Sequence, residues 1–581
     1  DGNAHALFMQ ASSGTVGIGT SSPSDYNALA NNLVVYENGS GGITIASSTS
    51  GTGSLYFADG TSGDNAYKGS IEYVHGSTNE LRFRANSVIK LVLDPDSRIS
   101  LSNNDSSGAV GTTLFGYKAG LNIVNGAVSN TFIGHEVADA TLTNAADYNT
   151  GVGGSALSSL TSGYSNAALG FQSLFTNTDG FQNTAIGTSA LYHNAGTDNN
   201  TAVGDQAGFY TTGANNTYVG QSAGRGASGA ETHNTGVGWQ ALKSITNGGF
   251  NVVLGSRSGE DLTTGDFNVF VGDFAGHASV DVDNAIAIGH AAMSANVTDD
   301  GDGTVAIGYS ALTALTSGKK NLAIGFQAQK ETTIGDSNIA IGYNAMFGDA
   351  GLQNDNNIAI GGENAAGSVL AAMGGQWTSN RCENNIAIGT GSLAGNMNDS
   401  HDNVAVGYKS LNAITTADNN TAIGSGAGQV TTTGGANTVV GYQALNGDTD
   451  GDGADNTALG HKALHDAISP SKNVAIGDSA MRVMNGSANG IADCVAIGAN
   501  AFYGDTDTTT ATDGTIAIGK DALKALHTGQ YNTAIGYNSM DEHESGRANT
   551  CLGWGTMSQS GGDTTAQDNT FIGASSGGGD W

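Results

Sequence analysis

The sequence is poor in residues that usually shape a globular fold. It holds 3 prolines and 3 cysteines among 581 residues, and 12 % of its residues are charged. Cys382, Cys494 and Cys551 lie far apart without the spacing of zinc ligands, so we expect them to be small packing residues. No run of about 18 apolar residues occurs, which argues against insertion into a membrane as a helix.

Basic residues are also scarce. The 20 lysines and arginines are outnumbered by 52 aspartates and glutamates, which gives a net charge of −32. Because this charge repels phosphate backbones and anionic lipids, neither nucleic acid nor a membrane surface is an expected partner. The 12 histidines show no paired zinc spacing, and the glycine-rich stretches lack the Lys-Ser/Thr pair of a phosphate loop. We expect no nucleotide cofactor and no enzymatic activity.

Glycine, by contrast, is abundant at 90 residues, and it recurs within one phrase. "NTAIGTSAL" begins at Asn183, "NTAVGDQAG" at Asn200 and "NTAIGYNSM" at Asn532. Aligned on its central glycine, the phrase occurs 26 times between Gly116 and Gly573, most often 17 residues apart. Internal repetition of this length is typical of a solenoid.

The apolar residues of the phrase alternate along the chain. Ile, Val, Leu or Phe precedes each repeat glycine, Thr, Val or Ile usually stands two positions earlier, and Ala is common between them. This period of two predicts a short strand. We expect the β-branched residues to point inward and the alanine to point outward. The Ala and Leu after the glycine, as in Ala190 and Leu191, predict a second inward position.

The residues that flank each strand predict corners. An Asn side chain opens most copies, where it bonds to turn or stacked backbone groups. The glycine closes the strand, where a positive φ or a close backbone approach excludes a Cβ. Variation in length falls in the polar segment that returns to the next Asn. The residues that we assign to this structural repeat include Asn183, Ile186, Gly187, Asn200, Val203, Gly204, Asn532, Ile535 and Gly536.

These patterns predict an all-β fold. Residues 106–581 are expected to form a β-solenoid or β-roll of about 26 short coils with a period of about 17 residues, stacked by backbone hydrogen bonds. Residues 1–105 alternate apolar and polar side chains and contain Asp-Gly and Gly-Ser turns, which predicts a β-rich shaft or meander.

One coil buries too little to be stable alone. It offers about three inward apolar side chains worth about 1.5 to 3 kcal/mol each, against about 1.5 kcal/mol per ordered residue. Additional burial between chains is therefore expected. An outward alanine would let another backbone approach, so we predict a parallel homotrimer.

The repeat phrases "NTAIGTSAL", "NIAIGYNAM" and "NVAIGDSAM" resemble the head repeats of trimeric autotransporter adhesins, over about Thr112 to Gly577. The resemblance implies short coils in a three-chain β-roll, although the period here is longer. The upstream segments "GTVGIGTSSPS" and "KLVLDPDSRISL" resemble the part of marine bacteriophage tail fibres that leads into such repeats. Adhesins of that family also need a C-terminal membrane barrel, and the ending "FIGASSGGGDW" lacks its amphipathic strands.

Few residues are candidates for specific chemistry. Asp448, Asp450 and Asp452 followed by glycine match the first half of a calcium loop, but Leu459 stands where its bidentate Glu belongs; calcium and solvated turn carboxylates are both open. The longest interruption of the repeat, Gly367 to Asn384, contains Trp377 and Arg381, residue types that are favoured in binding sites.

Shorter interruptions, Met481 to Asp493 and Phe502 to Asp513, are further candidates for contact with a partner. Together these features predict an extracellular structural fibre, foremost a phage tail or attachment fibre on the virion surface that binds a host cell-surface glycan or protein. A bacterial trimeric surface adhesin is the nearer alternative. The more distant alternative is a polysaccharide-degrading solenoid, in which acids such as Glu260 and Asp261 would serve as the catalytic carboxylates.

Overall fold

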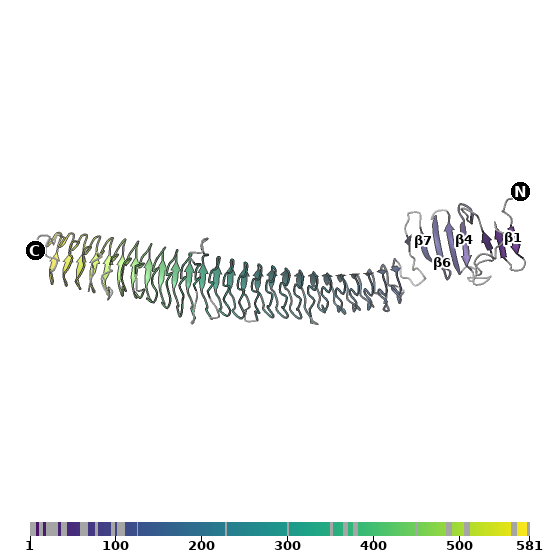
Figure 1. Ribbon diagram of the computed structural model, residues 1–581, viewed down its shortest axis with the longest axis horizontal. Coiled ribbons are helices and arrows are strands. Elements are labelled where there is room, and N and C mark those ends of the chain that lie inside the picture. Colours follow the sequence, from purple (N-terminus) through teal and green to yellow (C-terminus); the bar gives the residue numbers. More distant parts are fainter. Residues whose placement is uncertain are drawn as a thin grey trace.

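The computed structural model contains strands and turns in every part that it describes, and a long stack of short strands dominates it (Figure 1). The described residues are 7–10, 15–18, 33–35, 43–57, 68–75, 79–93, 99–100, 111–124, 126–226, 229–298, 301–348, 353–363, 370–375, 381–447, 451–483, 491–504, 512–558 and 566–577. Among these residues no helix is long and apolar enough to cross a membrane.

Two small sheets precede the stack. Strands β1 and β2 pair antiparallel, and β3 pairs parallel with β2. Strands β4 to β8 form an antiparallel sheet in sequence order, which agrees with the predicted meander. The bounds are β1 Leu7–Gln10, β2 Thr15–Ile18, β3 Leu33–Val35, β4 Thr52–Phe57, β5 Gly69–Val74, β6 Glu80–Ala85, β7 Val88–Leu93 and β8 Ile99–Ser100.

The stack is a parallel β-solenoid, as the sequence predicted. It contains one three-residue strand in each coil, from β9 to β34. These strands are β9 Thr113–Phe115, β10 Thr131–Ile133, β11 Thr150–Val152, β12 Ala167–Leu169, β13 Thr184–Ile186, β14 Thr201–Val203, β15 Thr217–Val219, β16 Thr235–Val237, β17 Val252–Leu254, β18 Val269–Val271, β19 Ile286–Ile288, β20 Val305–Ile307, β21 Leu322–Ile324, β22 Ile339–Ile341, β23 Ile358–Ile360, β24 Ile386–Ile388, β25 Val404–Val406, β26 Thr421–Ile423, β27 Thr438–Val440, β28 Thr457–Leu459, β29 Val474–Ile476, β30 Val495–Ile497, β31 Ile516–Ile518, β32 Thr533–Ile535, β33 Thr550–Leu552 and β34 Thr570–Ile572.

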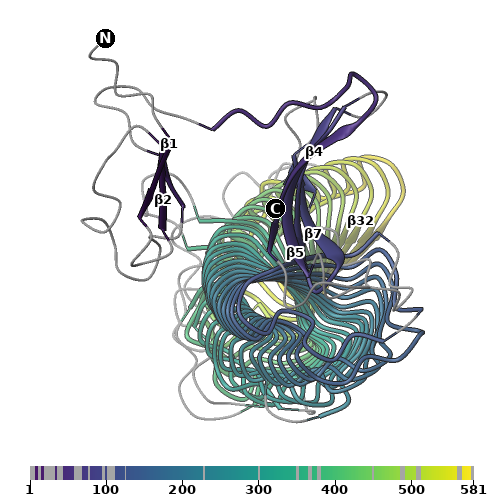
Figure 2. The same cartoon turned by 90° about the vertical axis from the view of Figure 1, so that its right-hand side faces the viewer.

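Equivalent residues of successive coils lie over one another. Strands β13 and β14 pair Thr184 with Thr201 and Ile186 with Val203, and the same register holds from β9 to β34. Backbone bonds run in both directions, because Thr184 N–H donates to Asn200 O (2.8 Å) and Gly187 N–H donates to Leu169 O (2.8 Å). Viewed along its length, the solenoid repeats nearly the same loop around one interior (Figure 2).

The side chains of the strands face the opposite way from the prediction. The middle residue of the strand, usually Ala, is buried, whereas the β-branched residues on either side are partly or largely exposed. The expectation that Ile186, Val203 and Ile535 point inward is therefore wrong. The interior is narrow at this point, since a Cβ built on Gly236, a middle residue, would lie 3.3 Å from Leu242 Cδ1.

The core consists instead of the middle alanines and of the Ala and Leu that follow the glycine. Ala185, Ala190 and Leu191 are fully buried, and the same three columns recur through the solenoid. The second inward position that the sequence predicted at Ala190 and Leu191 is confirmed. A small residue on the strand thus faces a large residue on the opposite wall.

In some coils the large residue stands in the middle of the strand and the small residue stands four positions after the repeat glycine. Phe270 and Tyr218 take the middle position of their strands, and glycines 276 and 224 then stand where other coils have Leu. A Cβ added to Gly276 would lie 2.6 Å from Phe270 Cδ2, and a Cβ on Gly224 would overlap the ring of Tyr218. In these two coils the aromatic ring fills the volume that Leu fills in other coils, as close packing requires.

The opening asparagines form a buried ladder along the solenoid. Asn216 N–H (2.9 Å) and Nδ2 (3.2 Å) both donate to Asn200 Oδ1. Asn200 Nδ2 in turn donates to Gly213 O at 2.9 Å. Each amide therefore satisfies backbone and side-chain groups of its neighbours, which buried polar groups need. Thr304 replaces Asn in one coil and still accepts from Asn321 N–H at 3.4 Å.

The repeat glycines are required for two separate reasons. Gly536 has a φ of +141°, which L side chains rarely adopt, and a Cβ there would overlap the carbonyl oxygen of Gly553 in the next coil. Gly573, in the last strand-bearing coil, has a similar φ of +119°, but a Cβ there would meet nothing within 4 Å. A side chain at Gly536 would meet both backbone strain and a clash with the next coil, whereas a side chain at Gly573 would meet backbone strain alone.

We predict that Gly536→Ala opens the solenoid locally, whereas Gly573→Ala has only the smaller effect of backbone strain, about 1–2 kcal/mol. Amide hydrogen exchange in β32 and β33 checks the first variant, and exchange in β34 checks the second. Equal loss of protection in the two variants would show that the close approach of stacked glycines is not the constraint.

We also predict that the sizes of the residues at positions 270 and 276 compensate each other in the core. Phe270→Ala leaves a cavity and should cost roughly 3–5 kcal/mol, while Gly276→Leu alone should clash with the ring. The double variant rebuilds the Ala and Leu pair of an ordinary coil, so we expect it to recover most of the lost stability. Hydrogen exchange of β17 to β19 measures the coupling, and additive losses would contradict the proposed packing.

Candidate functional site

The outward residues of the solenoid strands make one long exposed surface. We call this surface the sheet face and define it as the first and third residues of β9 to β34. In β17, Val252 and Leu254 are 48 % and 50 % exposed. Other large exposed third residues are Phe115, Ile133, Leu169, Ile186, Ile388, Ile423, Leu459, Ile497, Leu552 and Ile572. The surface therefore extends from the first coil to the last.

An aromatic column adjoins the sheet face, at the residue directly after the repeat glycine. Tyr309, Phe326 and Tyr343 stack with ring centroids 5.1 and 4.9 Å apart and planes 10° and 5° from parallel. Because each ring face is covered by the next ring, mainly ring edges meet solvent. This arrangement suits packing against an apolar surface better than stacking on the ring of a sugar.

The sheet face and the aromatic column run side by side along the solenoid, and their exposed apolar residues recur over a length far beyond the apolar patches of ordinary monomers, although Thr and charged residues interrupt them. Exposed members of the aromatic column occur in every third of the rod: Tyr117, Phe171, Trp239, Tyr309, Phe326, Tyr343, Tyr408, Tyr442, Tyr537 and Trp554. A surface of this kind is a candidate site of association.

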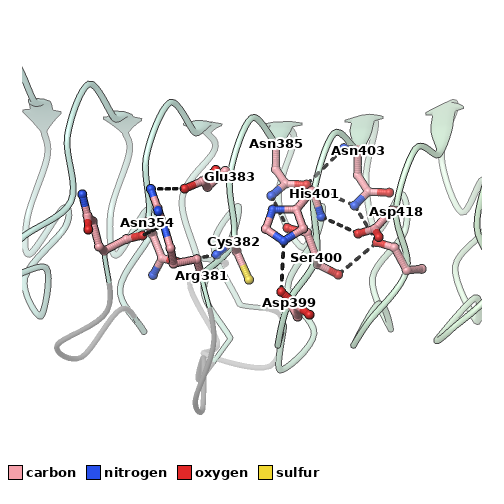
Figure 3. A network of polar contacts seen from close by, with 12 residues as sticks. Asn354, Arg381, Cys382, Glu383, Asn385, Asp399, Ser400, His401, Asn403 and Asp418 are labelled. Atoms are coloured by element: carbon pink, nitrogen blue, oxygen red, sulfur yellow. Dashed lines mark hydrogen bonds and ion pairs between the residues drawn. The ribbon is translucent and has the colours of Figure 1, made fainter.

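The interrupted coil around Arg381 contains a polar network (Figure 3). Arg381 Nη2 forms an ion pair with Asp355 Oδ2 at 2.7 Å and another with Glu383, while its Nε donates to Gln353 O at 3.0 Å. Its side chain is half exposed but ties the insertion to the preceding coil. A role in binding stays a prediction for Arg381, and its companion Trp377 lies outside the described residues.

Neighbouring polar side chains in Figure 3 do not form a nucleophile and base. The Ser400 hydroxyl donates to Ala417 O at 3.0 Å, whereas the His401 ring contacts Asp399 Oδ1 at 3.2 Å. His401 N–H donates to Asp418 Oδ1 at 2.7 Å, so that carboxylate braces the corner of the coil. These contacts are structural.

Glu260, one of the acids considered for polysaccharide cleavage, is held by three basic side chains. Lys243 Nζ lies 2.8 Å, His277 Nε2 3.1 Å and Arg257 Nε 3.4 Å from its carboxylate oxygens. Burial alone would raise the pKa of Glu260, but the hydrogen bond and charge of Lys243, with Arg257 and His277, hold this pKa below its ordinary value. Such a carboxylate is a poor proton donor near neutral pH.

The calcium prediction is only partly covered by the structure. Asp448 and Asp450 lie outside the described residues, and Asp452 is exposed. Within the described ranges, no group of three or more His, Cys, Asp or Glu side chains is placed to hold a metal ion. Calcium binding at this loop stays a prediction.

A groove lies beside the two shorter interruptions of the repeat. It has a volume of about 670 Å³ and is lined by Val483, Tyr503, Gly504, Lys524, Ala525, His527, Asp541, Glu542 and Glu544. Arg482 Nη1 donates to the Tyr503 hydroxyl at 3.2 Å, which fixes that ring at the rim. Burial, with the charges of Glu542 and Asp521, raises the pKa of Asp541. The groove offers acceptors, cations and an aromatic edge to a hydroxyl-rich ligand.

The sequence pointed to part of this groove. Val483 and Tyr503 belong to the interruptions at Met481 to Asp493 and Phe502 to Asp513, whereas Lys524, His527 and Asp541 stand in coils of nearly regular length and were missed. The sequence could have indicated these residues only through their position in the repeat. They follow their repeat glycines by five to eight residues, as Val483 and Tyr503 do. Residues so placed in successive coils line one side of a stack.

Comparison of the chain with protein-family models, curated proteins and solved structures finds no match.

The carboxyl group of Glu231 lies in the interior of the solenoid. Glu231 is fully buried and occupies a column in which neighbouring coils have Gly213 and Gly248. Burial raises the pKa of Glu231 to about 8, and neither carboxylate oxygen has a hydrogen-bond partner among the described residues. Burial and the nearby Glu231 also raise the pKa of Tyr218. The carboxyl is therefore neutral in the folded coil at neutral pH.

We predict that these coils lose stability as pH rises. The ordinary pKa is 4.5 and the folded value about 8, so the protonated carboxyl stabilises the fold fully below 4.5 and progressively less up to 8. The total loss is roughly 4–5 kcal/mol. Hydrogen exchange of β15 and β16 at pH 5 and pH 9 tests this, with Glu231→Gln expected to give a nearly flat profile. The same steep profile in Glu231→Gln would refute the assignment.

Proposed function

We propose that this chain is a structural fibre protein of an extracellular particle, foremost a bacteriophage tail or attachment fibre, and that three parallel copies form the fibre. The observation that carries the proposal is the apolar sheet face along the solenoid. Twenty-six strands about 4.8 Å apart span roughly 120 Å, so the protein is suited to rigid reach.

The best partner for the sheet face is another copy of itself. Its residues repeat at the spacing of the coils, and a second solenoid has the same spacing over the same length. A globular partner would match a few coils and leave the rest exposed. Association along the whole rod removes several thousand Å² of apolar surface from water, by order of magnitude, which is in the range of obligate assemblies.

A threefold arrangement covers more of this surface than a pair. The sheet face is three residues wide, and the aromatic column lies along one edge of it. Two solenoids placed face to face would cover the strands and leave both aromatic columns at the margin. Around a threefold axis, the aromatic column of one copy can pack against the sheet face of the next. The exposed rings of Tyr309, Phe326 and Tyr343 then gain partners.

Host attachment is the second part of the proposal. The groove lined by Tyr503 and Asp541 and the interrupted coil at Arg381 belong to the return segments, away from the sheet face. Three copies would present each such surface three times, and linked weak contacts gain avidity when they engage together. A glycan or protein of the host cell surface fits these polar surfaces. The proposed location is extracellular, on the virion.

We predict that lysine at exposed sheet-face positions dissociates the fibre. The test variant carries Leu169→Lys, Leu254→Lys, Ile388→Lys and Leu459→Lys, which are solvent-exposed in the single chain and should leave its fold intact. The control places four lysines at exposed aromatic residues just before the opening Asn: Tyr148, Phe250, Phe267 and Tyr531. Mass per length from electron microscopy and light scattering give the number of chains.

We expect three chains in the unmodified protein and in the control, and single chains in the sheet-face variant. A monomeric unmodified protein would refute the fibre assembly, and dissociation of the control alone would place the interface at the corner. Binding of the fibre to host cells, without loss of a capsular polysaccharide on incubation, separates attachment from the enzymatic alternative.

A further inference from the structure

The sheet formed by β4 to β7 has one predominantly apolar face. Directly paired residues of antiparallel strands share a face, so Leu55, Ile71, Phe83 and Leu91 form one row across it. The next row is Gly53, Tyr73, Leu81 and Leu93, and the third is Phe57, Gly69, Ala85 and Val88. No charged or hydroxyl-bearing residue except Tyr73 interrupts the three rows.

This apolar face is uncovered in the single chain. Leu55 is 48 % and Ile71 37 % exposed, although both occupy the central row. Ile43 and Ile45 add to it and help to line a hollow of about 410 Å³ together with Leu55, Ile71, Tyr73 and Leu81. A sheet with one apolar face normally buries that face against a second layer.

The opposite face is more polar, and its charged side chains form ion pairs with one another. Ser70 Oγ donates to Glu72 Oε1 at 2.6 Å, and Arg84 Nε donates to Glu72 Oε2 at 3.0 Å, with Ser70 and Glu72 buried beneath their neighbours. Arg82 and Glu80 form a further ion pair at 2.7 Å. The sheet is therefore two-sided, with a polar face whose charged side chains pair with one another and an apolar face that has no second layer in the single chain.

The solenoid, for its part, cannot align its own copies. Strands β19, β22, β23, β24 and β31 all read Ile-Ala-Ile, and at their outward first and third positions most other strands also carry only β-branched residues. If one copy slides along another by one coil, 25 of the 26 strands still face a strand of the same kind. The sheet face thus favours association while discriminating weakly between axial registers.

We propose that the apolar face of β4 to β7 packs against the same face in the other copies of this chain and thereby sets the axial register of the fibre. The inference rests on the proposed parallel association of solenoids. That association brings the non-repeating sheets of all copies to the same level, and the three faces can then close around the axis. A slip by one strand spacing leaves one of the four strands of this face without a partner strand, whereas the same slip leaves only one of the 26 solenoid strands without one.

The test uses the full chain in two co-produced forms, one with Ile288→Cys and the other with Ile324→Cys. These sheet-face residues are two coils apart, about 9.6 Å along the axis, which exceeds the reach of a disulfide. The native cysteines Cys382, Cys494 and Cys551 are buried and should not compete. Disulfides that join position 288 of two copies report an aligned fibre, and those that join position 288 to position 324 report slippage that reaches two coils.

The register variant is Leu55→Ser with Ile71→Thr, which keeps β-compatible residues and removes apolar surface that the single chain exposes. A second variant, Leu55→Glu with Ile71→Glu, adds charge at the same places. The matched control is Tyr56→Ser, since Tyr56 lies on the polar face of the same strand and is also exposed. Circular dichroism confirms that each variant retains its strands.

We expect the unmodified protein and the Tyr56→Ser control to form disulfides between like positions. Both register variants should remain trimeric but show a several-fold rise in disulfides between positions 288 and 324. Unchanged, aligned cross-links in both variants would overturn the inference and assign the apolar face to another partner. A monomeric unmodified protein would refute the assembly itself, a result that is distinct from trimers whose alignment ignores the sheet.

Discussion

The structure depends on one constraint, which is that each coil hydrogen-bonds in register to the coil before it and the coil after it. Backbone groups at the strand, at Gly187 and in the return turns all find partners about 17 residues away. A residue that suits one coil must then suit the stack. This explains why amides lie over amides and why a side chain is excluded from the glycine column: each position is repeated by contact with its own equivalents.

The sequence was sufficient to predict the architecture, but it did not predict the direction of the strand side chains. Period-two alternation places Ile186 and Ala185 on opposite faces without saying which face is inside, and average hydrophobicity favoured the wrong choice. Information on the interior was present in coils such as that of Phe270 and Gly276. There, the middle residue and the residue four after the glycine change size together. That covariation identifies the middle position as buried, because only residues that share a limited volume must compensate each other.

The reversed orientation of the strand side chains changes the physical reason for the proposed association. An outward alanine would have permitted close approach; outward Val252 and Leu254 make water contact costly over the length of the rod. The candidate sites were predicted less well than the fold. Composition made Arg381 a candidate, but it gave no indication of its neighbours Asp355 and Gln353, which come from the preceding coil, and the groove combines residues of several coils. Proximity of that kind arises from the coil spacing and leaves little trace in a linear motif.

Because insertions are confined to the return side, length along the axis and length along the chain are independent quantities. The coil that contains Arg381 is 28 residues long from Gly361 to Gly389, and β23 still pairs with β24 in the ordinary register. Such a scaffold can evolve new surface loops while its reach remains fixed by the number of windings, and it can evolve a different reach by duplicating windings while its loops remain unchanged.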